Sequence, residues 1–127
     1  MHTSVILATL LNEPEKKSLV QLTSGADLYV PYSVHWEIGN AFSAMLKRKR
    51  LHLEEALKAL DVYQKIPLHS VEVNLKEALE LASRFGIYAY DAYIVACARA
   101  QNLPLISLDK GLVKVAKEIG LKILEVT

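Results

Sequence analysis

Short apolar segments alternate along the chain with longer segments in which apolar residues recur every three or four positions. The second pattern is typical of amphipathic helices, as in the segment 32–49 with Val34, Ile38 and Phe42. It predicts helices at 4–11, 14–23, 32–49, 52–66, 75–85, 90–101 and 111–119. The short apolar segments predict strands at 27–30, 68–73, 104–109 and 121–126. Strands that alternate with helices indicate a parallel sheet, here of about four to five short strands, with helices on both faces.

Proline and glycine residues predict where several of these elements end. Pro31 ends the first of the four strands, and Pro67 follows the helix 52–66. Gly86 is expected to close the helix 75–85 in a left-handed conformation. The chain therefore reads as one three-layer α/β/α domain over residues 1–127.

Composition and charge narrow the class of protein. The chain has 127 residues, of which 52% are hydrophobic and 23% charged, and this balance is typical of one globular domain. The net charge is +1, so any site for a polyanion must be a local patch. Cys97 is the single cysteine, which excludes an intramolecular disulfide. The apolar run 5–11 is too short to span a membrane, and we expect a cytoplasmic protein.

Three acidic residues occupy positions where a site could form. Asp91 lies in the first turn of an otherwise apolar helix, where it is either a carboxylate favoured by the helix dipole or a site residue. Glu37 lies at the edge of the apolar stripe of its helix, beside small residues. Asp109 ends the strand 104–109, and on its own it would be a turn residue or a helix cap. Ligand sites in such folds gather at the carboxyl ends of strands, so the three side chains could converge.

Five segments, in this order and spacing, resemble the PIN-domain family of metal-dependent nucleases, and most closely its VapC-type toxins from prokaryotic toxin–antitoxin pairs. They are Thr3-Ser4-Val5-Ile6-Leu7, Asn12-Glu13-Pro14, Val30-Pro31 followed by Glu37, Tyr90-Asp91-Ala92-Tyr93, and the segment from Leu105 to Leu112. The resemblance covers nearly the whole chain. It implies a PIN-like fold, cleavage of RNA with one or two Mg²⁺ or Mn²⁺ ions, a homodimer, and a small antitoxin protein as partner.

The resemblance also assigns roles to residues. Glu37, Asp91 and Asp109 match three acidic positions of the family, which bind the metal and carry the catalysis. Packed carboxylates repel one another unless a cation neutralises them, and oxygen ligands favour Mg²⁺ or Mn²⁺. Such an ion activates the attacking water and stabilises charge on the phosphoryl oxygens.

The fourth acidic position of the family holds His2 in this sequence. A neutral imidazole can bind a metal but brings no negative charge, and it suits Mn²⁺ or Zn²⁺ better than Mg²⁺. Only Met1 precedes His2 in this sequence, and we therefore expect the strand that leads into the family's site to be missing. We expect either a truncated or misassigned start or a divergent member, with weakened activity in the chain as written.

Several other residues have both a functional and an ordinary interpretation. Thr3 and Ser4 could bind a phosphate, or they simply cap the first helix. Ser107 could orient Asp109 through a hydrogen bond, or be an ordinary strand residue. The basic run Lys47, Arg48, Lys49 and Arg50 could contact the RNA backbone, or be a solvated helix end. Tyr88, Tyr90 and Tyr93 could stack on bases, although such residues more often lie in a core or an interface.

The sequence thus predicts a metal-dependent endoribonuclease, the toxin of a type II toxin–antitoxin pair. A catalytically weakened or inactive PIN-like binding or scaffold protein is the alternative that His2 leaves open. A phospho-acceptor receiver domain needs acidic residues in a different order along the chain. A Rossmann cofactor site needs a glycine-rich turn, which the sequence lacks.

Replacing His2 with aspartate is expected to strengthen Mg²⁺ binding, because the change restores the negative charge of the fourth acidic position. Calorimetric titration of the chain and of the His2→Asp variant with Mg²⁺ and Mn²⁺ tests this. Equal Mg²⁺ affinity of the two proteins would contradict the role given to His2.

Overall fold

A computed structural model of the chain describes residues 28–124. Two strands, β1 (Leu28–Pro31) and β2 (Leu68–Val71), pair in parallel with Leu28 opposite Leu68 and Pro31 opposite Val71. The helices in this part of the chain are α3 (Ser33–Lys47), α4 (Leu53–Gln64), α5 (Leu75–Phe85), α6 (Ala89–Gln101) and α7 (Lys110–Glu118). The helices predicted at 4–11 and 14–23 lie outside the described residues, as do His2, Thr3 and Ser4.

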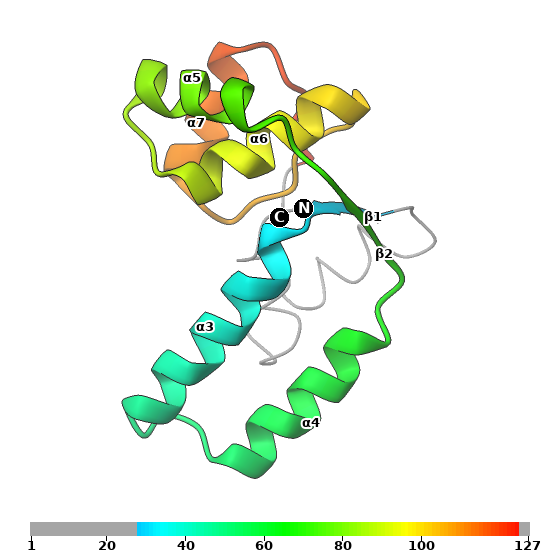
Figure 1. The fold of residues 1–127 in the computed structure, drawn as a ribbon, viewed down its shortest axis with the longest axis vertical. Helices are drawn as coiled ribbons and strands as arrows, with labels where there is room; N and C mark the ends of the chain where they lie inside the picture. Colours follow the sequence, from blue (N-terminus) through cyan, green and yellow to red (C-terminus); the bar gives the residue numbers. More distant parts are fainter. Residues whose placement is uncertain (1–27, 125–127) are drawn as a thin grey trace.

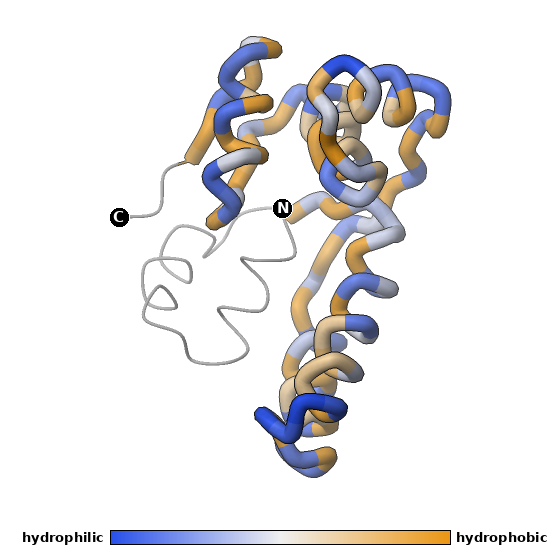
Figure 2. The backbone as a smooth tube through the Cα atoms, turned by 90° about the vertical axis from the view of Figure 1, so that its left-hand side faces the viewer, coloured by the Kyte–Doolittle hydropathy of each residue, from blue (hydrophilic) through white to orange (hydrophobic). Residues whose placement is uncertain are grey.

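The elements form two groups on either side of the strands. Figure 1 shows α5, α6 and α7 together at one end, and α3 and α4 as a helical hairpin that extends away from them. The strands β1 and β2 lie at the junction of the two groups. Figure 2 shows that the tip of the α3–α4 hairpin is the most hydrophilic stretch of its two helices.

The sheet is smaller than predicted within the part of the chain that the structure describes. The segments 104–109 and 121–126 contribute a single parallel bridge between Leu105 and Ile123 rather than two strands. It is held by hydrogen bonds from the Leu105 N–H to the Lys122 carbonyl (2.8 Å) and from the Leu124 N–H to the Leu105 carbonyl (3.0 Å). The prediction of parallel pairing is therefore right for these segments, but the pairing is shorter than predicted within the residues that the structure describes, which end at position 124. Apolar residues show that a segment is buried and do not show how far it pairs.

Helix ends follow local chemistry that the sequence makes visible. The Asn74 side chain accepts a hydrogen bond from the Glu77 N–H (3.0 Å) and begins α5, and Gly86 ends it with φ +64°. The prediction for Gly86 is confirmed, because this φ is one that glycine adopts without steric cost. Asn102, with φ +52°, ends α6 in the same conformation.

A hydrogen-bonded histidine joins α3, α4 and β2. His35 Nδ1 contacts the Tyr63 hydroxyl, and His35 Nε2 lies 2.7 Å from the Ser70 hydroxyl oxygen. Tyr63 is buried, and this burial raises the pKa of its hydroxyl. Both ring nitrogens of His35 are thus satisfied at the junction where the hairpin meets the sheet.

The Tyr63→Phe variant is expected to lower the free energy of unfolding by about 1–3 kcal/mol, because it leaves one nitrogen of the half-buried His35 ring without its partner. Urea unfolding of the two proteins measures the difference. Tyr88→Phe, at a residue that is 86% exposed, is the matched control and should change the stability little. Equal losses in both variants would show that the contact to His35 is not stabilising.

Candidate active site

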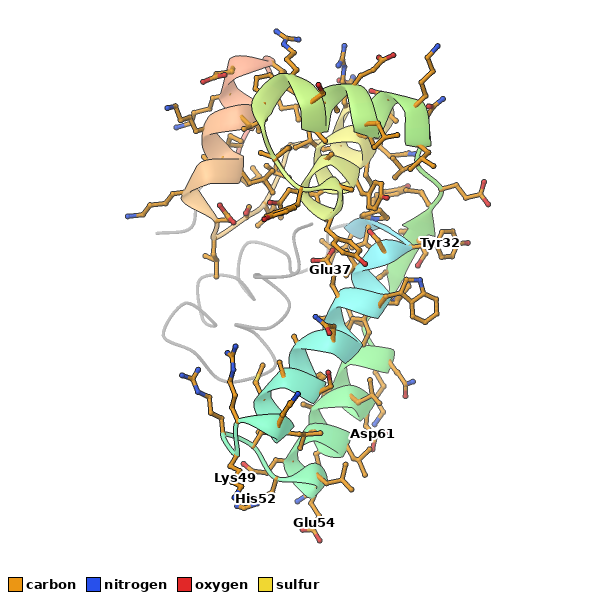
Figure 3. The ribbon with its side chains drawn as sticks, turned by 60° about the vertical axis from the view of Figure 1, so that its left-hand side comes forward. Tyr32, Glu37, Lys49, His52, Glu54 and Asp61 are labelled. Atoms are coloured by element: carbon orange, nitrogen blue, oxygen red, sulfur yellow. The ribbon has the colours of Figure 1, made fainter. Side chains whose placement is uncertain are left out.

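Glu37 lies in the second turn of α3, at the end of that helix nearest the strands. The neighbouring residues Val34 and Ile38 are fully buried, so Glu37 falls at the edge of the buried face and is itself half-buried. Its Oε1 atom is buried from solvent. Figure 3 places Glu37 at the opposite end of the hairpin from Lys49 and His52. The prediction that Glu37 borders the apolar stripe is confirmed.

Asp91 lies in the first turn of α6 and is half-buried. The helix that follows it is almost entirely inside the core, with Ala92 and all residues from Ile94 to Ala98 buried. No side chain caps this helix at Tyr88, and a carboxylate in the first turn is favoured by the partial positive charge there. Core packing of α6 therefore determines where Asp91 lies.

Asp109 is exposed and caps α7. Its Oδ1 atom accepts a hydrogen bond from the Leu112 N–H (3.1 Å). A Cβ atom at Gly111 would lie 3.3 Å from this same oxygen, so glycine leaves room for the carboxylate over the first turn. The helix-cap interpretation of Asp109 is confirmed. A carboxylate has a second oxygen that remains able to bind a cation.

Ser107 supports Asp109 through the backbone. The side chain of Ser107 is buried, and its Oγ atom accepts a hydrogen bond from the Asp109 N–H (3.0 Å). This bond holds the residue that carries the carboxylate at the start of α7. The partner is a backbone N–H, so the orienting role of Ser107 stays a prediction beside its ordinary interpretation as a strand residue.

The described residues do not assemble a complete metal site by themselves. Within residues 28–124, no group of three or more His, Cys, Asp or Glu side chains is arranged to hold an ion. Glu37, Asp91 and Asp109 have the oxygen chemistry that Mg²⁺ and Mn²⁺ prefer. Their convergence into one site stays a prediction, as do the roles of His2, Thr3 and Ser4 outside the described range.

The basic run lies at the tip of the α3–α4 hairpin. Lys47 is the last residue of α3, and Arg48, Lys49 and Arg50 form the turn that follows, with all four exposed. The turn is held by bonds from the Arg48, Lys49 and Arg50 N–H groups to carbonyls of the last helical turn. At the usual rise per residue, Glu37 and Lys47 are about 15 Å apart along the helix. The run is therefore a separate surface from the carboxylates.

A pocket that sequence reasoning missed lies at the carboxyl ends of β1 and β2. Its volume is about 440 Å³. It is lined by Pro31, Tyr32, Ser33, Val71, Glu72, Val73, Leu75 and Tyr93. The residues come from two strands, from the loops before α3 and α5, and from the three helices α3, α5 and α6, so no local pattern marks the whole set. The sequence signals were the general one that strand ends carry sites and the interpretation of Tyr93 as a residue that could stack on a base.

The comparisons with known proteins agree with this architecture. A family model described as "PIN domain" matches residues 2–118. The chain is 32% identical over 110 residues to a VapC ribonuclease of Mycobacterium bovis and to ribonuclease VapC9 of Mycobacterium tuberculosis, which covers 86% of this chain and 84% of each relative. The chain belongs to the PIN-domain family, and the predicted resemblance is confirmed.

A solved structure supports the fold. The crystal structure of PAE2754 from Pyrobaculum aerophilum superposes with a TM-score of 0.65 at 19% identity, over 89% of this chain and 75% of that one. This likeness confirms the PIN-like α/β fold. Among the helices of residues 28–124, none is long and apolar enough to cross a membrane.

Proposed function

We propose that the protein is a metal-dependent endoribonuclease that hydrolyses RNA phosphodiesters with an activated water, and that it is the toxin of a type II toxin–antitoxin pair. The observation that carries this proposal is the 32% identity to ribonucleases over most of both chains. The half-buried carboxylates of Glu37 and Asp91 support it, because solvent-shielded acidic residues at helix starts are suited to bind a cation.

Each residue of the proposed centre has a distinct task. Glu37 and Asp91 bind the ion through carboxylates that α3 and α6 hold in place. Asp109 binds the ion through the carboxylate oxygen that does not accept the hydrogen bond from the Leu112 N–H. Ser107 positions Asp109 through the hydrogen bond to its backbone N–H. Mg²⁺ or Mn²⁺, when bound, supplies activation of the attacking water and neutralises phosphoryl charge. His2 is the fourth candidate ligand, with Thr3 and Ser4 as contacts to the phosphate.

The partners follow from the same proposal. The substrate is RNA, and Lys47, Arg48, Lys49 and Arg50 contact its backbone at the tip of the hairpin. The chain works in the cytoplasm as a homodimer that a small antitoxin protein inhibits. These partners are proposed from the likeness to VapC ribonucleases.

A binding or scaffold protein without catalysis is the second candidate. One observation favours it: His2 stands at an acidic position of the family. The two functions differ in whether metal-dependent cleavage depends on Asp91.

The Asp91→Asn variant is expected to lose RNA cleavage in Mn²⁺ by at least about a hundredfold, because the amide brings no charge to the ion and metal assistance supplies several kcal/mol. Gel analysis of labelled RNA incubated with each protein measures the rates. Asp61→Asn, at an exposed residue on α4 away from Glu37, is the matched control (Figure 3). If the Asp91→Asn variant cleaves RNA as fast as the unchanged protein, the proposed role of Asp91 in the metal site is contradicted. If none of the proteins cleaves RNA, the function as a scaffold protein without catalysis is favoured.

Neutralising two charges at the hairpin tip is expected to weaken RNA binding and to flatten its salt dependence. For the Arg48→Gln/Arg50→Gln double variant, the slope of log K against log salt should fall by about 1.4, since each single-strand phosphate contact contributes about 0.7. These positions leave unchanged Lys49, the residue of the turn with a positive φ of +58°.

The control for this experiment is Lys58→Gln/Lys65→Gln, which removes the same charge from exposed positions of α4 and the residue after it. Binding is measured by fluorescence anisotropy over a range of salt concentrations. An unchanged slope in the arginine variant, or an equal change in both variants, would discard the tip as an RNA contact.

A further inference from the structure

The pocket at the carboxyl ends of β1 and β2 has the size of a small-molecule site. Its volume of about 440 Å³ lies within the usual range for ligand pockets of about 300–1,000 Å³. In parallel α/β sheets, ligands bind beyond the carboxyl ends of the strands, and Pro31 and Val71 are those ends here. The pocket thus lies where this class of fold places ligands.

The pocket lies beside the proposed catalytic centre. Ser33, which lines it, precedes Glu37 by four residues on α3, and residues at this spacing are neighbours on the same helix face. Figure 3 shows Tyr32 and Glu37 at the same end of α3, with their side chains on opposite sides of the helix in that view. At a helical rise of about 1.5 Å per residue, Ser33 and Glu37 are about 6 Å apart along the axis. A nucleic acid whose phosphodiester is held at Glu37 therefore brings a neighbouring nucleotide to the pocket.

The lining suits a nucleobase rather than a phosphate. Tyr32 is 52% exposed and Tyr93 is half-buried, so aromatic surface is accessible for stacking, and Pro31, Val71 and Val73 add apolar contacts. The exposed carboxylate of Glu72 repels a phosphate. The lining therefore fits a planar, uncharged ring.

One oxygen acceptor indicates which edge of the base is recognised. Glu72 is exposed at the pocket, and an ionised carboxylate only accepts hydrogen bonds. Guanine presents two adjacent N–H donors on its Watson–Crick edge, a pattern that a carboxylate accepts with both oxygens. Uracil presents only one donor there.

The geometry points to a nucleobase subsite in this pocket, which takes the base next to the cleaved phosphodiester and selects guanine through Glu72. This inference rests on the proposed ribonuclease function, and it adds a sequence preference for the substrate. Tyr32 supplies stacking for any base, and Glu72 supplies the selectivity.

The test measures binding of four short single-stranded 2′-O-methyl oligonucleotides, which are uridine throughout except for one central A, C, G or U. Fluorescence anisotropy is recorded for the full chain and for the variants Glu72→Gln and Tyr32→Ala. Glu80→Gln is the matched control, because Glu80 is exposed on α5 and does not line the pocket. Circular dichroism melts establish that each variant is folded.

The full chain and Glu80→Gln are expected to bind the guanine probe about tenfold more tightly than the uridine probe, the size of one charge-assisted hydrogen bond. Glu72→Gln should reduce this ratio to less than about twofold, while Tyr32→Ala should weaken binding of all four probes. Equal binding of the four probes by the full chain, or a guanine preference that Glu72→Gln retains, overturns the proposal. Unaltered RNA binding by both variants, as expected for a pocket that receives a side chain of a protein partner, also overturns it.

Failure of the subsite and failure of the ribonuclease proposal are distinguishable, because the probes cannot be cleaved through a 2′-O-methyl group and report binding alone. Guanine-selective binding without Mn²⁺-dependent cleavage of ordinary RNA overturns the ribonuclease proposal and supports guanine binding in the pocket, without a cleaved phosphodiester beside it. Cleavage of ordinary RNA with no guanine preference in binding overturns the subsite only.

Discussion

Burial of α6 is the interaction on which the rest of the structure depends. This helix packs against both α5 and β1, and Ile94, Val95 and Ala96 are at most 1% exposed. Burying Ile94 or Val95 contributes about 1.5–3 kcal/mol each, and the small side chains of Ala92 and Ala96 let the helix approach its neighbours closely. Asp91 is in the first turn of the same helix. The core therefore positions a carboxylate that would be costly to bury unless it had a cation or polar partner.

The helix α3 connects three surfaces that a ribonuclease can use. Its first turn borders the pocket through Tyr32 and Ser33, its second turn carries Glu37, and its last residue begins the basic tip. His35 joins this helix to Tyr63 and Ser70, so its position relative to α4 and β2 is set by hydrogen bonds as well as by apolar contacts. One helix thus holds an acidic group, part of the pocket lining and the start of the basic run at set distances along its axis.

Asp109 shows how one carboxylate can serve both stability and a site. One of its oxygens caps α7, and Ser107 holds its backbone. A cap typically contributes about 0.5–2 kcal/mol, so the residue has a reason to be there in any protein of this fold. Its proposed role as a ligand adds to this structural role and does not replace it. The helix-cap and metal-ligand interpretations of the sequence are therefore compatible.

The sequence by itself determined the features that arise from neighbouring residues. The helix 75–85 was predicted with its observed ends, and the other described helices were predicted to within two residues, because the three-to-four-residue period and the caps are local signals. The order of the acidic residues and the family segments was likewise readable from the chain. Tertiary structure decided what depends on distant residues. Packing limits two apolar segments to the single bridge between Leu105 and Ile123. It also brings His35 into contact with Tyr63 and Ser70, which are distant in the sequence. The pocket beside Glu37 is likewise formed by residues from separate elements.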